Sequence, residues 1–480
     1  MDYSQFLMMP QELGLLLVFL LVFLFDTFLP KKAQSSLSIF TCVVFALFTV
    51  ANVVMSGTGT SFAGMYEQTE ATYAMKLILN AGMLIVLIQA TKWANSEFVA
   101  VRRGEFYELL LATLLGMYIM ISARHFLLFV IGLETASLPL AALVAFDKKH
   151  YESHEAAAKY MFTAVFSSAI FMLGLSFVYA LAGSLYFNDI AVNIMGGQSA
   201  LLVVALVFVI AGVGFKLSLV PFHLWTADVY QGAPTAVTSY LSVISKGAAA
   251  FAFLVILAQV FGSAYSAAWE WMLYAVIVLT ITIGNLFAIR QRDLKRFLAF
   301  SSISQAGYIM LGVIAASEVG MASLMFYVLV YVFSNLAAFG VIAAIENKTG
   351  KVNMDDYNGL FKTNPWLAFS MMLAMFSLAG IPPFAGFFSK FFIFSSALQS
   401  GSVALYVLVL IALINTIVSL YYYLLVVKAM FINPNDQPIA AFKSHVSERI
   451  AIFVCVLGII LIGLASCIYA WLVESAAQFV

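Results

Sequence analysis

The chain contains 480 residues, of which 64% are apolar and only 10% carry a charge. Soluble domains carry roughly 25% charged residues, so this composition excludes an ordinary globular enzyme and indicates a protein that lies in a bilayer. Lysine plus arginine number 23, and so do aspartate plus glutamate. This balance offers neither the basic face typical of nucleic-acid binding nor a polybasic tail for a membrane surface.

Apolar runs long enough to cross a bilayer follow one another along the chain. A spanning helix needs about 20 mainly apolar residues, and by this criterion the sequence predicts an all-α integral membrane protein with about 14 transmembrane helices. The predicted spans cover residues 12–29, 37–56, 73–92, 107–122, 126–146, 156–182, 200–222, 235–260, 270–289, 298–316, 322–345, 366–398, 403–431 and 449–473.

The distribution of basic residues predicts the orientation, because cytoplasmic loops of membrane proteins are enriched in lysine and arginine. With the N-terminus outside, 17 of the 23 basic residues fall in cytoplasmic loops, while only Lys76 and Arg124 fall in outside loops. We therefore expect both termini on the outer side of the membrane.

Four lysines fall inside the predicted spans, where a charge at the bilayer centre costs about 2.5–3.5 kcal/mol. They are Lys159, Lys216, Lys246 and Lys390, and Glu134 is the single acid well inside a span. Lys159 lies near the end of its helix, so its side chain can reach the interface. For the other three, burial destabilises the charged form and a nearby carboxylate stabilises it. We therefore predict that they bind and release protons.

Two predicted spans are interrupted by proline and share a short motif. One reads F-K-L-S-L-V-P over residues 215–221, and the other reads F-S-L-A-G-I-P over residues 376–382. Helix breaks at membrane depth are tolerated only where the backbone is buried in protein or faces water. The motifs lie five spans apart, and an odd offset reverses the direction through the membrane. The pattern predicts an inverted repeat of two five-helix units, each with a broken helix at its transport site.

This repeat divides the chain into four parts. Residues 1–106 hold the first three helices, and residues 432–480 hold the C-terminal loop and the last helix. Residues 107–260 form the first repeat, with spans four to eight, and residues 270–431 form the second, with spans nine to thirteen. The two repeats differ chemically, because Ser377 stands at the position that matches Lys216.

The segment after the first break carries further polar residues and reads P-F-H-L-W-T-A-D-V-Y-Q-G-A-P-T over residues 221–235. His223 follows Lys216 on the same face if the helix continues, and histidine relays protons near neutral pH. The alternative is that His223 caps the broken helix or binds a freed carbonyl group.

This segment closely resembles the signature of the antiporter-like membrane subunits of respiratory complex I, and its W-T-x-D-V-Y-Q-G-A-P form is similar to the subunit N branch. The resemblance extends over nearly the whole chain. Ala227 departs from it, since a proline often stands there. The charged residues match within their short motifs: Glu134 in I-G-L-E-T, Lys159 in A-K-Y, Lys246 in I-S-K-G-A and Lys390 in G-F-F-S-K-F.

The resemblance implies a proton-translocating subunit of NADH:quinone oxidoreductase in a bacterial inner (plasma) membrane, with both termini periplasmic. In that family Glu134 would tune Lys216, Lys246 would pass protons along a hydrated lateral axis, and Lys390 would be the carrier on the exit side. The residues expected to transfer protons are Glu134, Lys159, Lys216, His223, Lys246 and Lys390.

The resemblance also implies that NADH oxidation and quinone reduction take place in other subunits of the complex. We expect no cofactor or metal in this chain, whose three cysteines lack CxxC spacing, whereas an iron–sulfur cluster needs about four thiolates. FMN and iron–sulfur clusters are expected in partner subunits. The expected partners are the other membrane-arm subunits, membrane lipid and protons, with no nucleic acid.

Other functional classes remain open at this point. A subunit of a multisubunit cation/proton antiporter shares broken helices and buried lysines but performs no redox work. A structural membrane scaffold does not explain unpaired lysines near the midplane. A haem-bearing or quinone-binding subunit is a further alternative, but haem needs histidines facing each other, and only His125 and His223 lie near a membrane segment.

Overall fold

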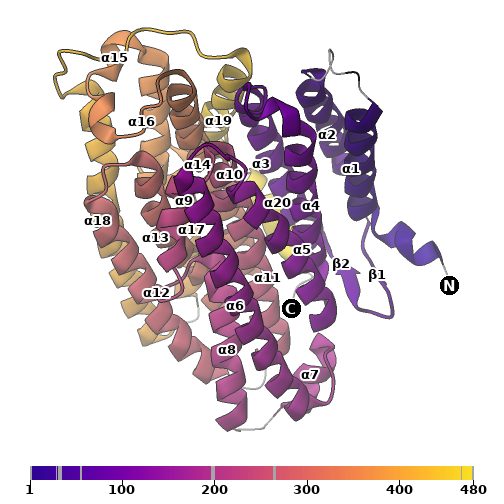
Figure 1. The fold of residues 1–480 in the computed structure, drawn as a ribbon. Coiled ribbons are helices and arrows are strands. Elements are labelled where there is room, and N and C mark those ends of the chain that lie inside the picture. The colour runs from indigo at the N-terminus through magenta and orange to yellow at the C-terminus, as the bar shows by residue number, and fades with distance from the viewer. Residues whose placement is uncertain are drawn as a thin grey trace.

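The computed structural model describes residues 3–28, 30, 35–54, 57–195, 200–262, 266–399, 401–465 and 467–477. This part of the chain is almost entirely helical, and its long helices lie side by side between the end that carries α15 and the end that carries α7 (Figure 1). The prediction of an all-α membrane protein is confirmed.

The N-terminal part and the first repeat contain most of the short elements. These are η1 (Tyr3–Met8), α1 (Pro10–Phe28), α2 (Ser36–Val54), β1 (Gly59–Ser61), β2 (Tyr66–Gln68), α3 (Glu70–Ala94), η3 (Ala100–Arg102), α4 (Arg103–Ser122), α5 (Phe126–Val144), α6 (Tyr151–Ala182), α7 (Phe187–Asn193), α8 (Ala200–Leu217), α9 (Leu224–Gly232), α10 (Thr235–Tyr240), η4 (Leu241–Ser245) and α11 (Lys246–Val260).

The second repeat and the C-terminal part follow. They contain α12 (Ser266–Ile289), α13 (Leu294–Ala315), α14 (Glu318–Thr349), η5 (Met354–Tyr357), α15 (Leu360–Thr363), α16 (Pro365–Ala379), α17 (Ala385–Leu398), α18 (Val403–Phe431), α19 (Val446–Leu464) and α20 (Cys467–Ala476).

Within the described residues, thirteen helices are long and apolar enough to cross a membrane. The twelfth predicted span is absent from this group because proline divides it into α16 and α17, each of which is shorter than a full span. The thirteen long helices and this broken pair account for every predicted span in order.

The two predicted repeats use the same order of helices. In the first repeat α4 packs on α5 and α6 packs on α8, and in the second α12 packs on α13 and α14 packs on α16 and α17. The fourth helix of each repeat is the broken one. Helices α11 and α13, which belong to different predicted repeats, pack together and are buried at the centre of the protein.

The first break lies between α8 and α9, where backbone groups leave the helical pattern and other parts of the chain bind them. The indole of Trp225 donates to the carbonyl of Phe215 at 3.2 Å, and the amide of Val220 donates to Thr280 Oγ1 at 3.0 Å. These bonds satisfy backbone groups that cannot find water in a bilayer.

The second break lies between α16 and α17 and brings the two helices very close. A Cβ atom on Gly386 would lie only 1.7 Å from the carbonyl oxygen of Ser377. Gly380 ends α16 with φ +87°, a left-handed conformation that glycine adopts without strain. Only glycine therefore fits at these two positions.

The β1–β2 hairpin is the one described sheet, and it packs at the end of the first helices. Its strands are antiparallel, with Ser61 opposite Tyr66. Tyr66 also forms a bridge to Ala123, and the amide of Arg124 donates to the carbonyl of Met65 at 2.8 Å. The hairpin therefore links α1 and α3 to the junction of α4 and α5.

Candidate functional site

Lys216 lies in the last turn of α8, immediately before the first break, and is buried. Its Nζ donates to Ser137 Oγ on α5 at 2.7 Å. Glu134 lies one turn before Ser137 on the same helix, and its Oε1 is buried without a partner among the described residues. No ion pair joins Glu134 to Lys216 in the described chain, so the hydroxyl of Ser137 holds the lysine next to a carboxylate that it does not contact.

Lys246 is the first residue of α11 and follows the π-helical turn η4, which the sequence did not predict. A π-helical turn inside an α-helix often marks a functional site. The side chain is 1% exposed, and its Nζ donates to Ser302 Oγ on α13 at 2.6 Å. The same nitrogen lies 5.6 Å from the centroid of the Tyr230 ring.

Lys390 lies on α17 and reaches back to the end of α16. Its buried Nζ donates to the carbonyl of Ala379 at 2.9 Å and lies 5.3 Å from the centroid of the Tyr308 ring. The C-terminal end of a helix carries partial negative charge. Lys216 and Lys390 are therefore both placed at the negative end of a broken helix, although they come from opposite sides of the two breaks.

A small cavity of about 10 Å³ adjoins Lys390, with Gln305, Tyr327, Ser377 and Ser389 among its lining residues. A cavity of roughly this size holds one water molecule. Gln305 accepts a hydrogen bond from Tyr327 and donates to Tyr423 Oη at 3.0 Å. The cavity is therefore polar on several sides.

Polar side chains continue from this cavity toward Lys246. The hydroxyl groups of Tyr423 and Ser301 lie 2.5 Å apart, and Ser301 adjoins Ser302, the partner of Lys246. Gln305, on the same helix α13, also bonds Tyr423. Helix α13 thus carries a line of polar groups that leads from Lys246 toward Lys390.

Lys159 is in different surroundings. Its side chain is 42% exposed and forms ion pairs with Glu155 at 2.7 Å and with Asp228 at 2.6 Å. Arg296 binds the other oxygen of Asp228 at 2.6 Å. Lys159 therefore differs from Lys216, Lys246 and Lys390, whose side chains are buried.

His223 does not continue the face of Lys216, because α8 ends at Leu217 and the chain leaves the helix before the histidine. It directly precedes α9, and its side chain forms no capping hydrogen bond. Its Nδ1 is buried without a partner in the described part of the chain. His223 was expected on that face only if the helix continued, and α8 ends before it.

Two charged residues were assigned wrongly from the sequence. Lys76 was placed in an outside loop, but it lies within α3 and is 0% exposed. Glu134 is not the single acid well inside a span, because Glu12 is buried in α1 and lies 2.5 Å from Lys76 Nζ. The sequence did contain a sign of this buried pair, namely an acid in the first span and a lysine near the start of the third.

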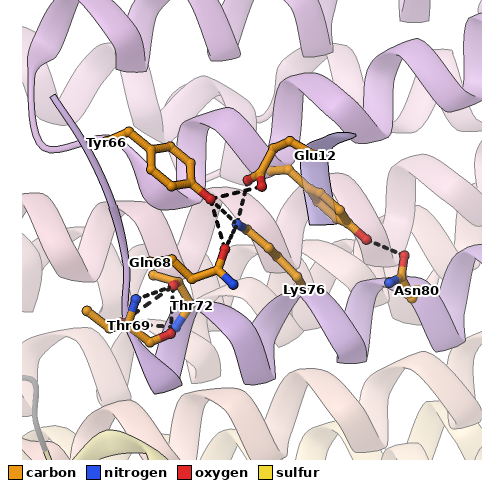
Figure 2. A network of polar contacts seen from close by, with 8 residues as sticks. Glu12, Tyr66, Gln68, Thr69, Thr72, Lys76 and Asn80 are labelled. Carbon is orange, nitrogen blue, oxygen red and sulfur yellow. Dashed lines mark hydrogen bonds and ion pairs between the residues drawn. The ribbon is translucent and has the colours of Figure 1, made fainter. Parts of the chain in front are cut away.

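Figure 2 shows the hydrogen-bond acceptors around the ammonium group of Lys76. Its Nζ donates to Glu12 Oε1, to Tyr66 Oη at 3.2 Å and to Gln68 Oε1 at 3.1 Å. A lysine has three donor hydrogens, so each has an acceptor. Lys216, Lys246 and Lys390, in contrast, each donate to one neutral oxygen and form no ion pair in the described structure.

Among the described residues there is no group of three or more His, Cys, Asp or Glu side chains that could hold a metal ion. Lys216, Lys246 and Lys390, each bonded to a hydroxyl or carbonyl oxygen, support the binding and transfer of protons.

Residues 123–419 match the family described as NADH:quinone oxidoreductase/Mrp antiporter, TM. A protein of Phocaeicola vulgatus named NADH-quinone oxidoreductase subunit N is 54% identical over 477 residues, which cover 99% of this chain and 100% of that protein. The chain belongs to the subunit N family.

Another relative and two solved structures are also similar to this chain. A subunit N from Azobacteroides pseudotrichonymphae is 52% identical over 98% of both chains. A chain of respiratory complex I from Thermus thermophilus is 31% identical and superimposes with a TM-score of 0.79 over 95% of this chain and 97% of that chain. A chain of the Mrp complex from Dietzia shares 20% identity, with a TM-score of 0.86 over 99% of this chain and 97% of that one, which shows a common fold.

Proposed function

We propose that this chain translocates protons in the membrane arm of NADH:quinone oxidoreductase. The observation that carries the proposal is the contrast between four buried lysines. Lys76 is neutralised by Glu12, whereas Lys216, Lys246 and Lys390 each rest on one neutral oxygen. A buried ammonium group without a carboxylate is costly to keep permanently charged, and this suits a group that binds and releases a proton.

The positions of the three lysines suggest the order of transfer. Lys216 and Lys390 lie at the two helix breaks, and Lys246 lies where the two repeats meet. The polar side chains of α13 support lateral transfer from Lys246 toward Lys390, since hydroxyl and amide groups pass protons through hydrogen bonds and intervening water. We assign Lys390 as the carrier on the exit side.

The remaining site residues lie outside the path from Lys246 to Lys390. We propose that Glu134 tunes Lys216 by approaching or leaving it, with Ser137 holding the lysine when the two are apart. His223 relays protons beside the first break. Lys159 belongs to the ion-pair cluster with Asp228 and Arg296, and we propose that it passes protons at the surface of the first repeat.

The partners follow from the relatives, which are named as subunits of NADH-quinone oxidoreductase. We propose that other membrane-arm subunits and lipid surround this chain in a bacterial inner membrane, with both termini periplasmic. FMN and iron–sulfur clusters belong to partner subunits that handle NADH and quinone. The alternative, a cation/proton antiporter subunit, predicts co-purification without flavin or iron–sulfur proteins.

Substitution of Lys246 tests the proposal. Lys246→Met replaces the lysine with an unbranched side chain of similar length that cannot bind a proton. We expect the assembled complex in sealed vesicles to lose proton pumping by about 100-fold, the lower end of what a positioned acid or base contributes. Pumping at the wild-type level in assembled Lys246→Met complex would exclude the proposed role.

A further inference from the structure

A large cavity opens where the ends of five helices meet. It has a volume of about 540 Å³ and lies between the ends of α3, α6, α10, α13 and α14. By the predicted topology, each of these ends faces the cytoplasm. Its lining includes Gln89, Thr235, Ser239, Lys295 and Glu346.

Glu346 is the acid that joins this cavity to the start of α10. Its Oε2 accepts a hydrogen bond from Thr235, and its Oε1 lies 3.5 Å from Lys295 Nζ. The side chain is 30% exposed, so water reaches it. Asp147, Glu152 and Asp293 line the same cavity, which therefore gathers acidic groups on a face otherwise rich in basic residues.

A row of hydroxyl groups leads from Glu346 to a buried lysine. Thr235, Ser239, Ser242 and Lys246 follow one another at spacings of four, three and four residues, which places them on one face of a helix. Ser239 and Ser242 are buried, and Ser242 Oγ accepts a hydrogen bond from Asn335 Nδ2 at 2.8 Å. The turn η4 lies within this row, between the cavity and Lys246.

Two buried amide groups beside the row have oxygens that no described protein group binds. Gln89, 4% exposed, lines the cavity with its Oε1 unpartnered, and Asn335, 0% exposed, has its Oδ1 unpartnered. Buried polar atoms are nearly always hydrogen-bonded, to protein or to ordered water. These oxygens therefore point to water along the path between the cavity and Lys246.

We propose that this cavity is the proton-uptake mouth that serves Lys246, with Glu346 as the collecting carboxylate. The inference rests on the proposed role of Lys246 in proton transfer. A proton from bulk water binds the carboxylate of Glu346 and then passes along Thr235, Ser239 and Ser242, and their bound water, to the neutral amine of Lys246. The amine becomes an ammonium group, the carboxylate is restored, and no electrons are exchanged.

The test uses the assembled complex in sealed vesicles, with NADH-driven proton pumping and NADH:quinone turnover measured in H2O and in D2O. Glu346→Gln keeps an acceptor for Thr235 but cannot carry a proton. We expect pumping and turnover to fall about tenfold and the solvent isotope effect to rise, because proton uptake becomes rate-limiting, while Glu346→Asp retains most activity. A purely structural role would lower turnover without changing the isotope effect, and that result would overturn the proposal.

Ser242 gives a second, matched comparison. Ser242→Val removes the hydroxyl group and fills the space that a water molecule would need, whereas Ser245→Val makes the same change in η4 outside the row. We expect only Ser242→Val to slow pumping. Equal activities in the two variants, or wild-type behaviour in Glu346→Gln, would exclude this path.

The Lys246→Met variant distinguishes failure of the proposed uptake mouth from failure of the proposed function. Impaired pumping in Lys246→Met together with wild-type pumping in Glu346→Gln and Ser242→Val would reject this uptake mouth and leave the proposed function standing. Wild-type pumping in Lys246→Met would reject the proposed function itself.

Discussion

Lys216 and Glu134 lie close to one another without forming an ion pair, because Ser137, one turn beyond the glutamate, accepts the hydrogen bond of the lysine at 2.7 Å. The carboxylate keeps one buried oxygen unpartnered in the described structure. This arrangement allows Glu134 to act on Lys216 by a small movement of either side chain.

A charge change at Glu134 is therefore expected to affect pumping more than a change in its length. Glu134→Gln removes the charge that stabilises the lysine ammonium group when the two approach, and we expect a large loss of pumping, of about tenfold. Glu134→Asp keeps the charge and should retain much of the activity. The measurement is proton pumping and NADH:quinone turnover in membranes with fully assembled complex.

Two results would contradict this account of the first repeat. One is wild-type pumping in both Glu134→Gln and Lys216→Met. The other is a loss confined to the amount of assembled complex, which would indicate a structural pair.

The pair formed by Glu12 and Lys76 is expected to behave differently, as a static contact between α1, α3 and the hairpin. Removing one partner of a buried ion pair costs about 3–5 kcal/mol, whereas replacing both by apolar groups is often neutral. Lys76→Met and Glu12→Leu should each lower the yield of assembled complex, and the double variant should recover it. Blue-native electrophoresis of membranes measures this yield.

The double variant also separates a static contact from a proton carrier. We expect the recovered complex to pump the same number of protons per NADH as the wild type. A recovered yield with impaired pumping would assign Lys76 to the proton path instead.

The orientation is open to a direct test with single cysteines. We expect cysteines introduced in the loops 147–149, 290–292 and 351–358 to be unreactive toward an impermeant thiol reagent in intact cells, because the distribution of basic residues places these loops in the cytoplasm. A cysteine at a position within 184–186 should react. Labelling of the loop at 351–358 from outside would overturn the topology.

The spans were predictable from the sequence because each depends only on a continuous apolar run of sufficient length. The breaks were predictable because Pro221 and Pro382 interrupt such runs. The three buried lysines were found in the same way, since a charge within an apolar run is conspicuous.

What the sequence did not reveal depends on contacts between distant segments. Lys76 and Glu12 are near the ends of their helices, where an apolar count cannot distinguish a buried pair from two solvated side chains. Only their contact with each other and with Tyr66 of the hairpin shows that they are paired. The π-helical turn before Lys246 has no sequence signature of its own. The cavity beside Glu346 needs five helix ends that lie far apart in the sequence.

Whether the buried lysines carry protons is measured by the number of protons pumped per NADH oxidised by complex containing Lys390→Arg. Arginine keeps the positive charge at the end of α16, but a guanidinium group has a pKa above about 12 and does not release its proton. We expect this ratio to fall in Lys390→Arg as far as it does in Lys390→Met. A wild-type ratio in the arginine variant would show that Lys390 is a fixed cation and does not carry protons.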